Sequence, residues 1–211
     1  MSRKLKITRD PLYEDDFLYK KSYMTFEEGV TILIGCNGSG KSTLLKELES
    51  KFKKDNTPCI RYDNFTQGGS HSRSEQAFFE NYSFLATAMC SSEGEEIMLN
   101  LKLKAAAIGK YVHDNPDIKE LWILMDAIDG LSIDAIDDLK TYLFKTILED
   151  ERLKDISKYI IVSTNVYEMV RGEKCFDVVE GKYITINDYE DYRKAIFNSR
   201  KYKDERYSNQ N

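Results

Sequence analysis

The sequence contains few of the residues that bind metals or form disulfides. Its 211 residues include four cysteines and two histidines. No two of the cysteines form a C-x-x-C pair, so we expect neither a zinc site nor a disulfide framework. A reduced, intracellular protein is the expectation that follows. The cysteines are Cys36, Cys59, Cys90 and Cys175.

Long apolar runs and an excess of positive charge are also lacking. The run Leu121–Met125 has only five residues, whereas a membrane-spanning helix needs about 20. The first ten residues lack the apolar stretch of a secretory signal, so we expect a soluble, cytoplasmic protein without a membrane partner. Lysine and arginine total 31 against 36 acidic residues, and the net charge is −5. Nucleic acid would therefore have to bind at a local basic patch.

What the sequence does contain is enough apolar material for one packed domain over residues 1–211. Apolar residues make up 41%, with only three prolines and eleven glycines. Apolar runs without alternation predict strands that are covered on both faces, as in a parallel sheet. Glu180–Lys182, between two β-branched segments, predicts a hairpin. The predicted strands are Val30–Ile34, Cys59–Tyr62, Leu121–Met125, Tyr159–Ser163, Phe176–Val179 and Tyr183–Ile186.

Helical patterns lie between these strands. Four apolar residues after residue 43, namely Leu44, Leu45, Leu48 and Phe52, have the spacing of one helix face. Further helices are predicted over Gly94–Val112, over Ile133–Leu148 and over Tyr189–Tyr202. The alternation of strands and helices predicts an α/β fold with a mainly parallel core sheet flanked by helices. The apolar face predicted for the third helix consists of Ile136, Leu139, Leu143 and Ile147.

A glycine-rich segment directly follows the predicted strand Val30–Ile34. Residues 35–43 fit the pattern G-x-x-x-x-G-K-[ST] of a phosphate-binding loop between a strand and a helix. The glycines let backbone N–H groups point at phosphate oxygens, and the helix N-terminus adds partial positive charge. Lys41 is expected to reach the β- and γ-phosphates, and Ser42 to ligate Mg²⁺. The predicted nucleotide-binding residues are Gly35, Asn37, Gly38, Ser39, Gly40, Lys41, Ser42 and Thr43.

A site of this type also needs a carboxylate at the end of a second strand, to hold Mg²⁺ through water. Leu121–Met125 is followed by Asp126, which we predict as a catalytic and metal-binding residue. The next residue is Ala127, at the position where a glutamate would polarise the attacking water, and a methyl group cannot accept a proton. Asp129 has two interpretations, as a substitute base or as a residue that shapes the loop at Asp129–Gly130.

The order of these segments resembles the ABC-type ATPases, and more closely their soluble branch near the SMC and DNA-repair ATPases than the transporters. Residues 91–95, Ser-Ser-Glu-Gly-Glu, resemble the signature motif of that family. Residues 129–134 are similar to its D-loop, although one residue short. Asn165 follows a predicted strand where the switch histidine of the family would lie, and Gln67 corresponds to the Q-loop glutamine, a further metal contact.

The resemblance implies a P-loop NTPase fold of ABC type with N-terminal antiparallel strands. Only 51 residues separate Lys41 from Ser92, so the helical lobe of the family would be strongly reduced, to about residues 63–92. The signature residues would face the γ-phosphate bound by a second copy, giving a homodimer with ATP and Mg²⁺ buried between the chains. These residues are Ser92, Glu93, Gly94 and Glu95.

Two substitutions bear on hydrolysis. Ala127 replaces the catalytic glutamate of the family, and Asn165 replaces its switch histidine. Asparagine can hydrogen-bond a phosphate but cannot shuttle a proton. The expected function is thus ATP–Mg²⁺ binding by an ATPase head that acts as a conformational switch, with slow or partner-dependent hydrolysis. The alternative is a non-hydrolysing pseudo-ATPase that uses ATP as a structural ligand or sensor.

Other functions have less support in the sequence. The guanine-binding tetrapeptide N-K-x-D of GTPases does not occur, and no arginine-rich lid indicates a small kinase. The C-terminal helix and tail, about residues 188–211, are basic and have two interpretations, a solvated helix face or a nucleic-acid contact. Tyr19 and Tyr23 are candidates to stack on the base. The basic C-terminal residues are Arg193, Lys194, Arg200, Lys201, Lys203 and Arg206.

Overall fold

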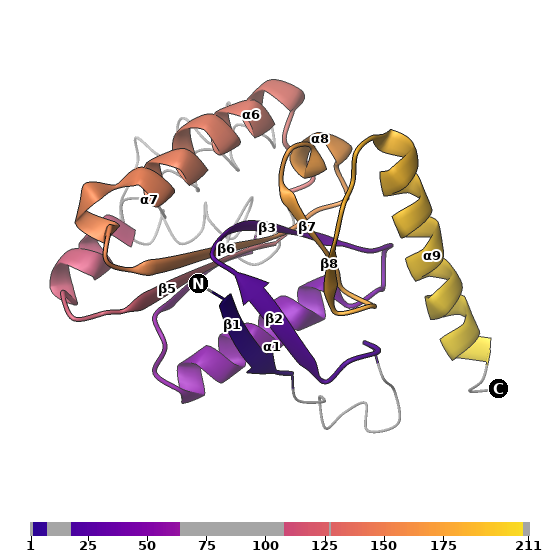
Figure 1. The fold of residues 1–211 in the computed structure, drawn as a ribbon, viewed down its shortest axis with the longest axis horizontal. Helices are drawn as coiled ribbons and strands as arrows, with labels where there is room; N and C mark the ends of the chain where they lie inside the picture. The colour runs from indigo at the N-terminus through magenta and orange to yellow at the C-terminus, as the bar shows by residue number, and fades with distance from the viewer. Residues whose placement is uncertain (1, 8–17, 64–107, 127, 209–211) are drawn as a thin grey trace, which may run out of the picture.

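The chain folds around a mostly parallel sheet with helices on both sides (Figure 1). The computed structural model describes residues 2–7, 18–63, 108–126 and 128–208. The strand order is β4-β5-β6-β3-β7-β8, and every neighbouring pair is parallel except β7 and β8. The predicted α/β fold with a mainly parallel sheet is thereby confirmed. The strands are β3 (Gly29–Ile34), β4 (Cys59–Asp63), β5 (Glu120–Asp126), β6 (Ser157–Ser163), β7 (Lys174–Asp177) and β8 (Lys182–Ile184).

The predicted hairpin is confirmed as the antiparallel pair β7–β8, but both strands end earlier than the sequence suggested. The pairing runs from Cys175 opposite Ile184 to Asp177 opposite Lys182. Gly181 has a φ of 61°, a left-handed conformation that favours glycine, and its N–H donates to the carbonyl of Asp177. The turn therefore begins at Asp177, so the first strand lies two residues earlier than predicted.

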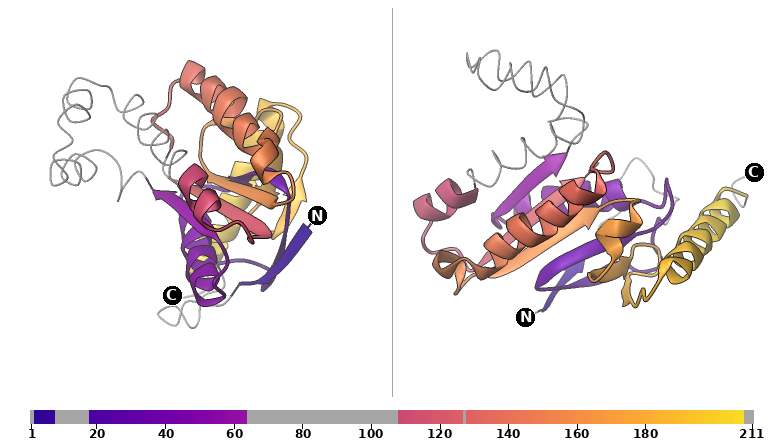
Figure 2. Two further views of the ribbon diagram at one scale, coloured as in Figure 1. Left: turned by 90° about the vertical axis from the view of Figure 1, so that its left-hand side faces the viewer. Right: turned by 90° about the horizontal axis from the view of Figure 1, so that it is seen from above.

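One face of the sheet is covered by α1 (Lys41–Lys54) and by a separate antiparallel pair of strands. The pair consists of β1 (Ser2–Lys6) and β2 (Tyr23–Glu27), as expected for the N-terminal strands. Figure 2 shows the two strands on the same side of the sheet as α1. The residues predicted for the inner face of α1 are all buried, namely Leu44, Leu45, Leu48 and Phe52.

The opposite face is covered by one continuous helical segment formed by α6 (Ile133–Asp138), the π-helical η2 (Leu139–Phe144) and α7 (Lys145–Glu149). The predicted apolar face is confirmed, since Ile136, Leu139 and Ile147 are buried in one core. Leu143 is partly buried and packs against the same core, which also contains Phe144. A π-helical turn holds one residue more than an α-helical turn, so Phe144 joins the buried face.

The last helix, α9 (Tyr189–Ser208), is longer than predicted and lies at one end of the molecule (Figures 1 and 2). Two short helices, η3 (Glu151–Leu153) and α8 (Tyr167–Val170), precede β6 and β7. Residues 108–114 are helical, the end of the helix predicted from Gly94. The rest of that helix and residues 64–92 of the predicted reduced lobe lie outside the described residues.

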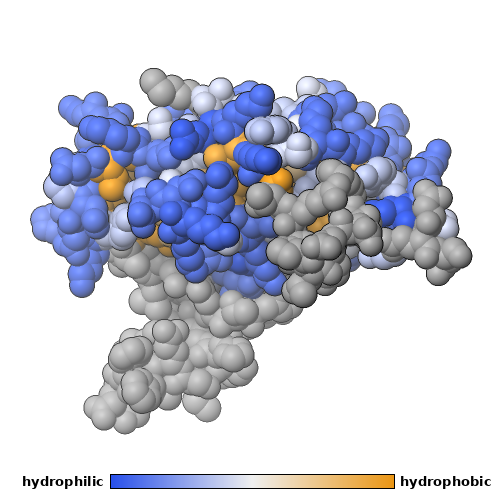
Figure 3. Space-filling model, turned by 90° about the horizontal axis from the view of Figure 1, so that it is seen from below, coloured by the Kyte–Doolittle hydropathy of each residue, from blue (hydrophilic) through white to orange (hydrophobic). Residues whose placement is uncertain are grey.

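One face of the molecule shows how polar and apolar residues are distributed over the described surface. Figure 3 shows a face that is mostly hydrophilic, with only small apolar areas among the described residues. In the described part of the chain, no helix has the length and apolar character needed to cross a membrane.

Candidate functional site

The glycine-rich segment 35–43 connects β3 to α1, the position predicted from the sequence. Gly38 and Gly40 have φ values of 78° and 99°, which side chains rarely adopt. A Cβ at Gly40 would lie 2.8 Å from the ring of Tyr19. Because Gly40 is also the N-cap of α1, the first turn of the helix has no side-chain cap. The N–H groups of this turn are therefore left without a side-chain partner, and the N-terminus of a helix favours an anion.

Lys41 extends back over this loop instead of toward solvent. Its ammonium donates to the carbonyls of Gly35 (2.6 Å) and Cys36 (3.3 Å) and to Oδ1 of Asn165 (2.9 Å). Burial lowers the pKa of Lys41, and the negative charges of Asp129 and Asp126 oppose that shift. The structure therefore holds a buried cation, only 7% exposed, at the mouth of the loop.

Tyr19 supports the loop from beneath. Its ring is buried, and its hydroxyl donates to the carbonyl of Gly40 at 2.9 Å. Burial raises the pKa of this phenol, which therefore stays a neutral donor. In this arrangement Tyr19 presents no open ring face to a base. Tyr23 is half-exposed on β2, where the ammonium of Lys4 lies 5.2 Å from its ring centroid.

The predicted metal residues lie together at the carboxyl end of β5. The hydroxyl of Ser42, in the first turn of α1, donates to Oδ1 of Asp126 at 3.0 Å. Mg²⁺ prefers oxygen ligands and often takes only one or two from the protein, with water and phosphate completing its shell. Among the described residues no cluster of three or more histidine, cysteine, aspartate or glutamate side chains is placed to hold a metal. Water or a bound ligand would complete the shell of any Mg²⁺ held by Ser42 and Asp126.

Sequence reasoning missed Arg61, which contacts the same aspartate. Its guanidinium lies 3.4 Å from Oδ2 of Asp126, 3.0 Å from Asp63 and 3.0 Å from Glu49. Asp63 and Asp126 lie opposite each other in the parallel pair β4–β5. The side chain of Arg61 is only 9% exposed, so this ion-pair cluster is partly desolvated and orients Asp126. The sequence feature that could have indicated this role is an arginine within the predicted strand Cys59–Tyr62, whose other residues are apolar.

Asp129 holds the segment that follows β6. Its carboxylate accepts hydrogen bonds from the hydroxyl of Thr164 (2.7 Å) and from the backbone N–H (2.8 Å) and side-chain amide (2.9 Å) of Asn165. The amide of Asn165 is thereby oriented with its oxygen toward Lys41. Of the two interpretations of Asp129, this geometry favours the loop-shaping one, since both carboxylate oxygens are engaged.

Replacement of Asp129 with alanine is expected to lower the free energy of unfolding by about 2 kcal/mol, because three hydrogen bonds to a charged acceptor are lost. Urea denaturation followed by circular dichroism measures this change. The control is Asp137→Ala, which removes an exposed carboxylate on α6. Equal stability of the two variants would show that Asp129 does not hold the loop.

Helix α9 also reaches the phosphate loop, a feature without a sequence signal. The hydroxyl of Ser199 accepts a hydrogen bond from the N–H of Cys36 at 2.8 Å in a buried position. The ammonium of Lys203 donates to the carbonyl of Asn37 at 3.2 Å. Tyr192 donates its hydroxyl to the carbonyl of Asn165 at 2.8 Å, so α9 contacts both segments that surround Lys41.

The basic residues of α9 are mostly paired with acids on the same helix. Such exposed pairs at i,i+3 and i,i+4 are weak, so the cations remain able to bind an anion, while the neighbouring carboxylates lower the net charge of the helix. The pairs are Arg193–Glu190, Lys194–Asp191, Arg200–Asp204 and Lys201–Glu205.

Several predicted site residues lie outside the described residues. They are Gln67, the signature residues Ser92, Glu93, Gly94 and Glu95, and Ala127. The structure brings the others together at the carboxyl ends of β3, β5 and β6, where parallel sheets of this kind bind ligands. In the comparisons with known proteins, no protein-family model matches this chain, and no curated protein matches it either.

Proposed function

We propose that this chain is a P-loop NTPase of the ABC type that binds ATP together with Mg²⁺ at the phosphate loop 35–43. The observation that carries the proposal is the position of the Lys41 ammonium. It lies over a loop with two left-handed glycines, at a strand–helix junction and in the same site as the Ser42–Asp126 pair. A glycine turn with an unrelated lysine would not require this arrangement.

The residues present fit the chemistry of the ligand. The uncapped N–H groups of α1 and the Lys41 ammonium are donors that suit phosphate oxygens. The buried hydroxyl of Ser39 has no hydrogen-bond partner among the described residues, and it lies within the loop. Ser42 and Asp126 supply oxygen ligands for Mg²⁺, directly or through water. When bound, Mg²⁺ would neutralise phosphate charge.

We further propose that the head dimerises around ATP and acts as a conformational switch whose hydrolysis is slow or depends on a partner. The resemblance of residues 91–95 to the family signature supports the dimer. Slow hydrolysis is supported by Ala127, which offers no base, and by Asn165, whose amide cannot transfer a proton. The partner would be either another protein or a nucleic acid. A nucleic acid would bind at the basic C-terminal segment.

A second candidate function is a pseudo-ATPase that binds ATP without hydrolysing it. The engagement of both Asp129 oxygens by Thr164 and Asn165 favours it, because Asp129 was the remaining candidate base. An ATP-turnover assay, with and without DNA, distinguishes the two functions. Phosphate release above the background of a Lys41→Ala variant supports an ATPase, and release at that background supports the pseudo-ATPase.

ATP with Mg²⁺ is expected to shift the mass of the purified protein from that of one chain to that of two. The physical reason is that each ATP would be held by Lys41 of one chain and the signature residues of the other. Light scattering with and without ATP–Mg²⁺ measures the shift. A Gly94→Asp variant is the control, since the added carboxylate should repel the γ-phosphate and prevent dimers. An unchanged monomer mass for the wild type contradicts the dimer.

A further inference from the structure

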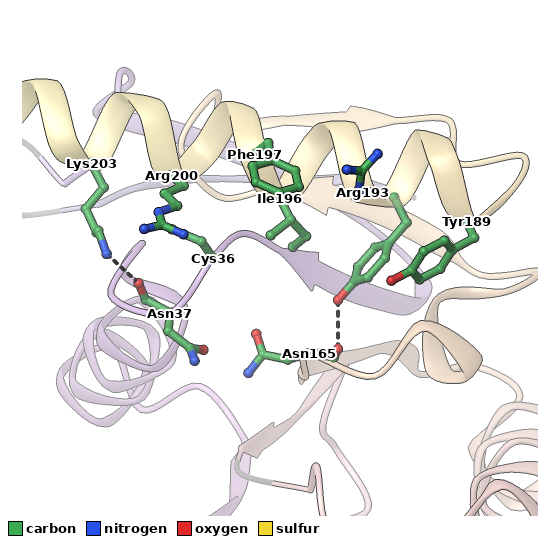
Figure 4. A pocket seen from close by; sticks show the side chains of 10 residues that line it. Cys36, Asn37, Asn165, Tyr189, Arg193, Ile196, Phe197, Arg200 and Lys203 are labelled. Atoms are coloured by element: carbon green, nitrogen blue, oxygen red, sulfur yellow. Dashed lines mark hydrogen bonds between the residues drawn. The ribbon is translucent and has the colours of Figure 1, made fainter.

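A groove-shaped cavity of about 560 Å³ is lined by residues of α9 and of the phosphate loop (Figure 4). Its walls come from two distant parts of the chain. Cys36 and Asn37 of the loop and Asn165 after β6 form one side, and residues of α9 form the other. Figure 4 shows Arg200 and Lys203 extending from α9 toward the segment that carries Cys36 and Asn37.

This cavity adjoins the cation that we assign to phosphate binding. Asn165 lines the cavity, and its Oδ1 accepts the hydrogen bond from the Lys41 ammonium at 2.9 Å. An anionic ligand that accepts the hydrogen bond of the Lys41 ammonium in place of Asn165 would therefore lie at the edge of the cavity. The part of that ligand farthest into the cavity would be its terminal phosphate.

The lining of the cavity is positive. Arg193, Arg200 and Lys203 contribute to it, and no described carboxylate does. The pairs that Arg193 and Arg200 form with acids on α9 are at least half exposed, so they are weak and compete poorly with a phosphate. The ammonium of Lys203 donates to a neutral carbonyl, that of Asn37. An anion in the cavity would thus gain charge-assisted hydrogen bonds.

The helix that carries these cations is fixed in place. Ser199 is buried against Cys36, and Tyr192 is bonded to the carbonyl of Asn165. The Lys203 side chain packs on Gly38, where a Cβ would lie 3.4 Å from its Cδ. Arg200 and Lys203 are one turn apart and project to the same side, whereas Arg193 lies about 15 Å from Lys203 along the helix axis.

We propose that Arg200 and Lys203 bind the terminal phosphate of the nucleotide held by the same chain, so that α9 distinguishes nucleoside triphosphate from diphosphate. This inference rests on the proposed function. The diphosphate ends at the loop and Lys41, and it does not reach the α9 wall. Only the triphosphate contacts both Lys41 and the cations of α9.

The test compares the dissociation constants of ATP–Mg²⁺ and ADP–Mg²⁺ for the full chain by isothermal titration calorimetry. The double variant Arg200→Gln with Lys203→Gln keeps much of the length of both side chains but removes their charge. It is expected to bind ATP about tenfold or more weakly while its affinity for ADP changes by less than about threefold. Circular dichroism confirms that α9 remains folded.

The matched control is Lys194→Gln with Lys201→Gln. These two residues also lie on α9, are about three-quarters exposed and do not line the cavity. Their replacement removes the same charge and is expected to leave both affinities unchanged. An effect of equal size in the two double variants would indicate long-range attraction and overturn the proposal.

The remaining outcomes are also decisive. Equal losses of ATP and ADP affinity in the Arg200/Lys203 variant, or no loss, overturn this proposal while the proposed function stands. Loss of binding to a single-stranded DNA oligonucleotide, with an unchanged ATP-to-ADP ratio, assigns the cavity to nucleic acid instead. A wild-type chain that binds neither nucleotide overturns the proposed function and this inference with it.

Discussion

Replacement of Lys41 with alanine is expected to abolish binding of ATP–Mg²⁺. The ammonium is the buried cation over the loop, and it already donates to three oxygens of Gly35, Cys36 and Asn165. A hydrogen bond between charged groups contributes about 1.5–3 kcal/mol, and each 1.4 kcal/mol is tenfold in affinity. Since one ammonium contacts two phosphates in such a loop, we expect a loss of at least about 100-fold.

A fluorescent ATP analogue and its anisotropy measure this loss. The matched control is Lys46→Ala, which removes an exposed lysine from the next turn of α1. The control is expected to bind like the wild type. Similar affinities for the wild type, Lys41→Ala and Lys46→Ala would mean that the loop 35–43 is not the binding site.

Replacement of Trp122 with alanine is expected to lower the free energy of unfolding by about 3–5 kcal/mol, because it empties the centre of one core. The indole on β5 is fully buried. It stacks on Tyr159 with ring centroids 4.1 Å apart, and Phe52 lies 4.6 Å from it. A domain with a total stability of about 5–15 kcal/mol loses a large share of it in this way.

Urea denaturation followed by far-ultraviolet circular dichroism measures the change, since the variant lacks the only tryptophan. Tyr142→Ala is the control, because this aromatic residue is 67% exposed on the helical segment of the opposite face. Its replacement is expected to change stability by less than about 0.5 kcal/mol. A loss below about 1 kcal/mol for Trp122→Ala would contradict the packing described for β5.

The central strands and the phosphate loop were predictable because their signals are local. Val30–Ile34 and Leu121–Met125 are apolar without alternation, and the structure covers both faces of β3 and β5. The G-x-x-x-x-G-K-[ST] pattern lies within eight consecutive residues, from Gly35 to Ser42. The proximity of Ser42 and Asp126 also followed from the sequence, because both were expected at the carboxyl edge of one parallel sheet.

The parts that could not be predicted depend on distant contacts or on backbone irregularity. Ser199 and Lys203 form hydrogen bonds with loop residues that are 163 and 166 positions away in the sequence. Rules based on residue spacing do not predict contacts at such sequence separations. The role of Arg61 as the centre of an ion-pair cluster depends on its three carboxylate partners, which the fold brings together. These partners are Glu49, Asp63 and Asp126. The π-helical turn adds Phe144 to the buried face, because regular 3.6-residue spacing does not include the extra residue.

Isothermal titration calorimetry of the wild type measures whether this chain binds ATP with Mg²⁺ at the phosphate loop. We expect saturable binding of one nucleotide per chain, and weaker binding when the metal is removed with a chelator, because Ser42 and Asp126 act through Mg²⁺. If ATP does not bind saturably in the presence of Mg²⁺, the chain is not an ATP-binding protein of this kind.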